Sequence, residues 1–158
     1  MGEMTEFLRH TVATLAYRGG KVLRGTPSGF GAWRPGETSR TALEILSHIG
    51  DLLDWGLALA DGQHIWAEAG TATWEEAVDR FHAGLKRLDD RLVSGRRLGN
   101  PVERLFQGPI ADALTHVGQL AMMRRLYGGA IRGENYFKAE IVAGRVGAEQ
   151  AAPRREFD

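Results

Sequence analysis

Two histidines and one aspartate are the residues of this chain whose types and spacing best suit metal chemistry. His48 lies in one apolar stretch, and Asp112 and His116 lie four residues apart in another. Because four residues span slightly more than one helical turn, Asp112 and His116 would project from the same helix face and could contact one ion. If a neighbouring helix delivers His48, the three side chains would leave an open position on a divalent cation.

The composition limits the other kinds of site. The chain has no cysteine, which excludes disulfides, thiolate ligands and a thiol nucleophile of the protein itself. Twenty acidic residues balance twenty basic ones, and the arginines occur in scattered pairs, such as Arg124-Arg125, that we expect at solvated helix ends. We therefore expect no nucleic-acid partner. No apolar run reaches the roughly twenty residues that cross a bilayer, and the N-terminal stretch lacks a signal-peptide pattern. A cytoplasmic protein without a membrane partner is expected.

The hydrophobic periodicity predicts an all-α fold, a four-helix bundle with long connections in one domain of residues 1–158. The first expected helix covers about 4–23, and the second runs from an N-cap at Thr38 or Ser39 to about 60. The third starts at the capping box of Thr73 and ends at 93 or 98, and the fourth runs from about Pro109 to 128. Gly19-Gly20 should weaken the first helix. A short C-terminal helix, at 135–143, or an arm is expected after the bundle, and residues 146–158 are expected to form an extended or frayed tail. No strand is expected.

The three candidate ligands fall at the margin of the apolar arc of their helices, not at its centre. His48 lies beside Ile45 and Leu52 in this projection, and Asp112 and His116 flank the arc of the fourth helix. Side chains at the margins of two packed helices can line a cleft at the mouth of a bundle. An ion held there would be within reach of a small molecule.

Each candidate ligand also has a simpler interpretation. A histidine flanked by leucines, such as His48, is commonly a hydrogen-bonded packing residue. Asp112 suits the first turn of a helix, near the positive end of its dipole. Asp112 and His116 together can form an ordinary side-chain hydrogen bond at helical spacing. Spacing alone leaves these interpretations and the metal site open.

Two stretches resemble the DinB-like (damage-inducible) four-helix-bundle family. Trp33-Arg-Pro35 and Thr41-Ala-Leu-Glu-Ile-Leu-Ser-His48 are similar to the second-helix signature of that family, and residues 111–125 are similar to its last bundle helix. The resemblance covers about residues 4–130. It implies a divalent ion, commonly nickel or zinc, held by a histidine of the second helix and a His-x-x-x-His pair of the later one. Here Asp112 replaces the first histidine of that pair, as a carboxylate does in some related thiol-dependent enzymes.

The resemblance implies a metal-dependent enzyme with His48, Asp112 and His116 as its ligands. Several DinB-like proteins are similar to transferases and isomerases that use low-molecular-weight thiols such as bacillithiol or mycothiol, so a thiol S-transferase is expected. An open ion could also activate water, as in a hydrolase. Zinc or nickel is expected, and manganese or iron would also suit two imidazoles and a carboxylate. The implied partners are a small-molecule thiol or electrophile and a second copy in a homodimer. The alternative is a non-catalytic dimeric bundle that binds a small ligand or partner, with an empty or structural site.

Other residues near the predicted site have two interpretations each. Asp51 and Gln119 lie one turn from His48 and His116, so they could orient the ligands or be ordinary surface groups. Glu134 could be a further ligand if residues 133–137 fold over the cleft. Three side chains could line the pocket or belong to the core: Trp55, Met123 and Tyr136. The remaining histidines are expected to be surface or structural: His10, His64 and His82.

Overall fold

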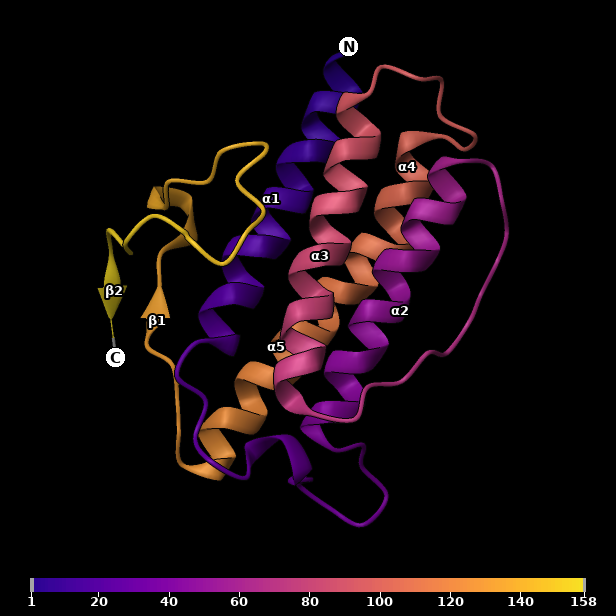
Figure 1. The fold of residues 1–158 in the computed structure, drawn as a ribbon. Coiled ribbons are helices and arrows are strands. Elements are labelled where there is room, and N and C mark those ends of the chain that lie inside the picture. Colours follow the sequence, from indigo (N-terminus) through magenta and orange to yellow (C-terminus); the bar gives the residue numbers. More distant parts are fainter. Residues whose placement is uncertain (1, 158) are drawn as a thin grey trace.

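Four long helical segments run side by side in the computed structural model, which describes residues 2–157 (Figure 1). They are α1 (Glu3–Leu23), α2 (Ala42–Ala60), α3 (Trp74–Val93) and a last segment formed by α4 (Val102–Leu105), the π-helical turn η2 (Phe106–Ile110) and α5 (Ala111–Tyr127). The predicted all-α, four-helix fold is therefore confirmed. None of the helices within residues 2–157 combines the length and the apolar character needed to cross a membrane.

Capping boxes fix the starts of α2 and α3. The Thr73 hydroxyl accepts from the Glu76 N–H at 3.1 Å, and the Glu76 carboxylate accepts from the Thr73 N–H at 3.2 Å, as predicted. At α2 the cap is Thr41, which pairs in the same way with Glu44. The predicted cap at Thr38 or Ser39 is wrong, because only Thr41 has a glutamate three residues later to complete the box.

The last bundle helix begins earlier than predicted. Helical structure starts at Val102, and Pro109 lies inside η2 and not at a helix start. Proline has no N–H and its ring crowds the preceding turn, which disfavours regular α-helical pairing at this point. The chain adopts a wider π turn here and then continues as α5. α5 ends where predicted, at Gly128 with a φ of 102°.

A C-terminal arm follows the bundle and lies beside α1 (Figure 1). Its strands β1 (Gly133–Glu134) and β2 (Glu156–Phe157) pair antiparallel, so the expectation of no strand is wrong. Of the short helix or arm that the sequence predicts after the bundle, the arm forms, and residues 135–143 contain only the short 3₁₀ turn η3 (Tyr136–Lys138). A second such turn, η1 (Phe30–Ala32), lies in the connection between α1 and α2.

The core is formed by one apolar stripe from each long helix. Its most buried members include Val12, Leu15, Ile49, Leu53, Phe81, Leu85, Ile110 and Leu120. α1 runs unbroken through Gly19, where a Cβ atom would lie only 2.5 Å from Cζ of Phe81. The glycine therefore has a packing role, because it lets α3 place an aromatic ring directly against the α1 backbone.

Candidate metal centre

His48, Asp112 and His116 come together between two facing helices, with His48 on α2 and the other two on α5. Asp112 Oδ2 lies 3.8 Å from His48 Nε2, and Asp112 Oδ1 lies 3.5 Å from His116 Nε2. One ligand atom from each residue lies within 4.8 Å of the others. The structure thus brings all three predicted ligands into one group that could hold a metal ion.

The donor separations fit a small divalent cation. Metal–nitrogen bonds of about 2.0–2.1 Å place neighbouring ligand atoms of a tetrahedral site roughly 3.3 Å apart. The observed gaps of 3.5 and 3.8 Å are slightly wider, and small side-chain rotations would close them. The Asp112 side chain is 47% exposed, so it has room to rotate. The two imidazoles are better fixed, because their side chains are only 19% and 14% exposed.

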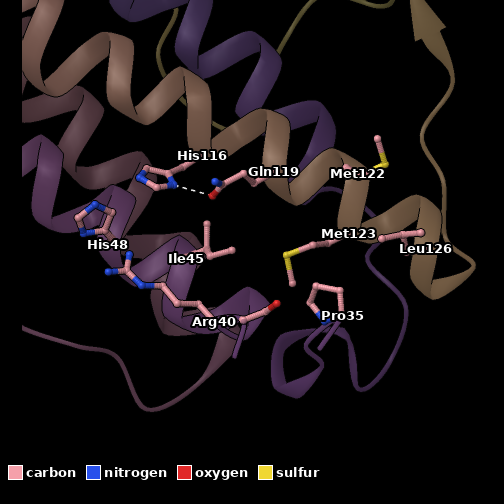
Figure 2. A pocket seen from close by; sticks show the side chains of 10 residues that line it. Pro35, Arg40, Ile45, His48, His116, Gln119, Met122, Met123 and Leu126 are labelled. Atoms are coloured by element: carbon pink, nitrogen blue, oxygen red, sulfur yellow. Dashed lines mark hydrogen bonds between the residues drawn. The ribbon is translucent and has the colours of Figure 1, made fainter. Parts of the chain in front are cut away.

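Gln119 determines which nitrogen of His116 faces the site. Its side-chain oxygen lies 2.7 Å from Nδ1 of His116, an interaction drawn as a dashed line in Figure 2. An amide oxygen can only accept a hydrogen bond, so Nδ1 carries the proton. Nε2 is left with its lone pair, on the side of Asp112. Metal-binding histidines are typically oriented by a partner of this kind. Gln119 is therefore an orienting group.

Burial lowers the pKa of His48. The nearby His116 and Arg40 lower this pKa further, while Asp112 and Asp51 act in the opposite direction. A lowered pKa keeps the imidazole neutral at physiological pH, and the neutral form is the one that binds metal.

An aromatic pair flanks His48 on the side of the connection between α2 and α3. The Trp66 ring packs edge-on against His48, with centroids 5.6 Å apart. Trp66 in turn packs against Trp55, with centroids 5.8 Å apart. Trp55 therefore supports the site through Trp66 and does not line the main cavity. Trp66 was not foreseen from the sequence, because it lies in an irregular segment without periodic signal.

Asp51 does not orient His48. It is buried, and Oδ1 accepts from Arg80 Nη2 at 2.7 Å and from the Ala69 N–H at 3.1 Å. These bonds tie the connection between α2 and α3 to the bundle. Asp51 thus helps hold the segment that carries Trp66. It is buried, and its hydrogen bonds go to Ala69 and Arg80 and not to a metal ligand.

A cavity of about 650 Å³ opens beside the two imidazoles (Figure 2). His48, His116 and Gln119 form its polar end. The rest of its wall is largely apolar and includes Pro35, Ile45, Met122, Met123 and Leu126. The guanidinium of Arg40 lies close to His48 at the edge of this space. Met123 lines the cavity as the sequence suggested, whereas Tyr136 lies elsewhere, stacked under Arg18.

Glu134 and the remaining histidines lie away from this cavity. The Glu134 carboxylate is buried and accepts from the Tyr17 hydroxyl and from Lys21 Nζ, each at 2.7 Å, so its suggested ligand role is wrong. No residue of 133–137 lines the cavity. Among the other histidines, His82 is partly buried on α3 and the other two are exposed, namely His10 and His64.

Arg40 is the charged residue of the site that sequence reasoning missed. It precedes the N-cap of α2 by one position, so the helical periodicity gave no indication that it shares a surface with His48. The capping box at Thr41 and Glu44 fixes where α2 begins. It therefore also fixes the position of Arg40 relative to His48, the metal ligand on the same helix.

Comparisons with known proteins return no match to a family model, to a curated protein or to a solved structure. The resemblance to the DinB-like bundles therefore stays a prediction, and the fold with its His-Asp-His group is what the molecule itself shows.

Proposed function

We propose that this chain is a metal-dependent enzyme of the DinB-like kind that joins a low-molecular-weight thiol to an electrophile. The observation that carries the proposal is the convergence of two imidazoles and one carboxylate at the end of a 650 Å³ cavity. The hydrogen bond from His116 to Gln119 adds support. It leaves Nε2 of His116 unprotonated and facing the Asp112 carboxylate, which is the arrangement that a bound cation would stabilise.

Three protein ligands leave at least one coordination position open to the cavity. A divalent ion bound there would lower the pKa of a thiol or a water molecule, so that a nucleophile is present near neutral pH. Because the chain has no cysteine, a thiol nucleophile has to come from solution. The apolar wall around Met122, Met123 and Leu126 would hold the carbon skeleton of a substrate and exclude water from it.

The donor set supports zinc or nickel as the resident ion. Two imidazoles and one carboxylate also accommodate manganese or iron, so the choice depends on geometry and availability. The resemblance to the DinB-like bundles further implies a homodimer in the cytoplasm. Sedimentation velocity on the purified chain would test the dimer, and a monomer at micromolar concentration would contradict it.

Metal analysis followed by turnover tests the proposal. Protein purified without chelators should contain about one transition-metal ion per chain. His116→Ala should lose it, whereas the matched variant His10→Ala should retain it, because His10 is exposed on α1 and lines neither cavity that contacts His48. Loaded protein should then consume 1-chloro-2,4-dinitrobenzene in the presence of a thiol. A metal-free wild-type protein at neutral pH would refute the metal site. A loaded but inactive protein would favour the non-catalytic alternative.

A further inference from the structure

Arg40 has an unused guanidinium beside the candidate metal centre. Its side chain makes neither a hydrogen bond nor an ion pair with any residue of the described range 2–157. It lines the 650 Å³ cavity and also a second cavity of about 330 Å³, and both cavities contact His48. In Figure 2 the guanidinium lies next to the His48 ring. A cation with free donors therefore stands where a bound molecule would meet the metal ligands.

This situation differs from that of the arginines that the bundle buries at least in part. Carboxylates or carbonyl oxygens hold each such arginine of the helices: Arg9, Arg80, Arg91 and Arg124. Glu44 lies near Arg40 and lines the smaller cavity with it, but its Oε2 accepts the Thr41 N–H at 2.7 Å in the capping box and forms no ion pair with Arg40 within residues 2–157. Glu68 also lines the smaller cavity and forms no ion pair with Arg40 within residues 2–157. A guanidinium has five N–H donors, and those of Arg40 remain available.

The charge balance of the main cavity favours an anion. Within the described residues 2–157, Asp112 is the one acidic group of the metal-ligand cluster, and no acidic residue lines the cavity wall itself. With both imidazoles neutral, a divalent ion and Arg40 together would outweigh the single carboxylate and leave the site positive. The opposite wall is apolar, with Ile45, Met123 and Leu126. A ligand that matches both features has an anionic end and an apolar stem.

We propose that the thiol used at this site carries a carboxylate, which Arg40 binds while the sulfur meets the metal end of the cavity and the stem lies against the apolar wall. The inference rests on the proposed function, because the sulfur needs the ion held by His48, Asp112 and His116. A planar guanidinium matches a carboxylate with two parallel hydrogen bonds, which gives direction as well as attraction. Arg40 is thus a specificity-determining residue and takes no part in the bond-forming step.

Paired thiols that differ in charge test this inference. Calorimetric titration of zinc-loaded protein would compare 3-mercaptopropionate and 6-mercaptohexanoate with 3-mercapto-1-propanol and 6-mercapto-1-hexanol. For the wild type we expect at least one carboxylated thiol to bind about tenfold or more tightly than its alcohol partner, as is typical of a charge-assisted pair. Arg40→Gln should remove this preference and Arg40→Lys should keep part of it. Arg34→Gln is the matched control, since Arg34 is an exposed arginine of the same connection that lines neither cavity.

The outcomes separate this inference from the proposed function. Equal affinity of the wild type for charged and neutral thiols would overturn the role of Arg40 and leave the metal-dependent function standing. A preference that survives Arg40→Gln would also overturn it, because the carboxylate would then be contacting the metal or another group. Failure of every thiol to bind, or failure to load zinc, would overturn the proposed function and this inference with it. Zinc content and circular dichroism of each variant would reveal a folding defect. If Arg40→Gln is misfolded, Arg40→Lys takes its place in the comparison with the wild type.

Discussion

Replacing Gln119 with leucine should weaken metal binding without touching a ligand. The Gln119 oxygen accepts the Nδ1 proton of His116 at 2.7 Å and so keeps Nε2 unprotonated and aimed at Asp112. Leucine has a similar volume but no acceptor, so the ring could rotate and either nitrogen could carry the proton. Loss of such an orienting partner typically costs about 10–100-fold in metal affinity. This corresponds to about 1.4–2.8 kcal/mol of binding free energy.

Competition with a chromophoric zinc chelator at pH 7.5 would measure this affinity. Gln119→Glu is the complementary variant, because a carboxylate is a stronger acceptor for the Nδ1 proton, and zinc should bind at least as tightly as in the wild type. Gln107→Leu is the matched control, since this exposed glutamine precedes α5 and forms no hydrogen bond with a ligand. If Gln119→Leu binds zinc as tightly as the wild type does, the reasoning about the orientation of His116 is refuted.

Three further predictions concern the fold that holds the site. Gly19→Ala places a Cβ atom 2.5 Å from Cζ of Phe81, and this overpacking should lower the free energy of unfolding by about 1–3 kcal/mol in urea titrations. An unchanged midpoint would show that the ring shifts at no cost. Lys21→Met leaves the Glu134 carboxylate, 0% exposed, without its cation, which should cost about 3–5 kcal/mol and loosen the C-terminal arm in hydrogen exchange. Wild-type protection of the arm in this variant would contradict that. Burial lowers the pKa of His82 from 6.5, so the unfolded chain takes up the proton first. The resulting stability is complete above about pH 6.5 and is lost as the pH falls through the folded-state pKa. His82→Gln should flatten this part of the stability curve, and an unchanged slope would contradict the assignment.

The parts of the fold that the sequence predicts are those with local signals. Thr73 and Glu76 indicate the start of α3, because a capping box needs only a four-residue span. The pairing of Asp112 with His116 is likewise local, since helical spacing alone brings them to one face. The position of His48 next to them depends on how α2 packs against α5. The apolar arcs indicated which faces would meet, and the structure shows that this packing brings His48 next to Asp112.

The parts that the sequence does not predict depend on contacts between distant residues. Arg124 looked like one of the solvated helix-end arginines, yet it is buried and donates to the carbonyl oxygens of Val22, Arg24 and Gly25. These acceptors lie about a hundred positions earlier, at the end of α1, and no local pattern marks them. The pairing of β1 with β2 is hidden for the same reason, because each strand has only two residues.

His48, Asp112 and His116 together should bind one cation. Anomalous diffraction at the zinc edge, from crystals of zinc-loaded protein, tests this prediction most directly. We expect one peak bonded to Nε2 of both histidines and to an Asp112 oxygen, at about 2.0–2.2 Å from each. A peak elsewhere, or none between α2 and α5 in fully loaded protein, would contradict the prediction.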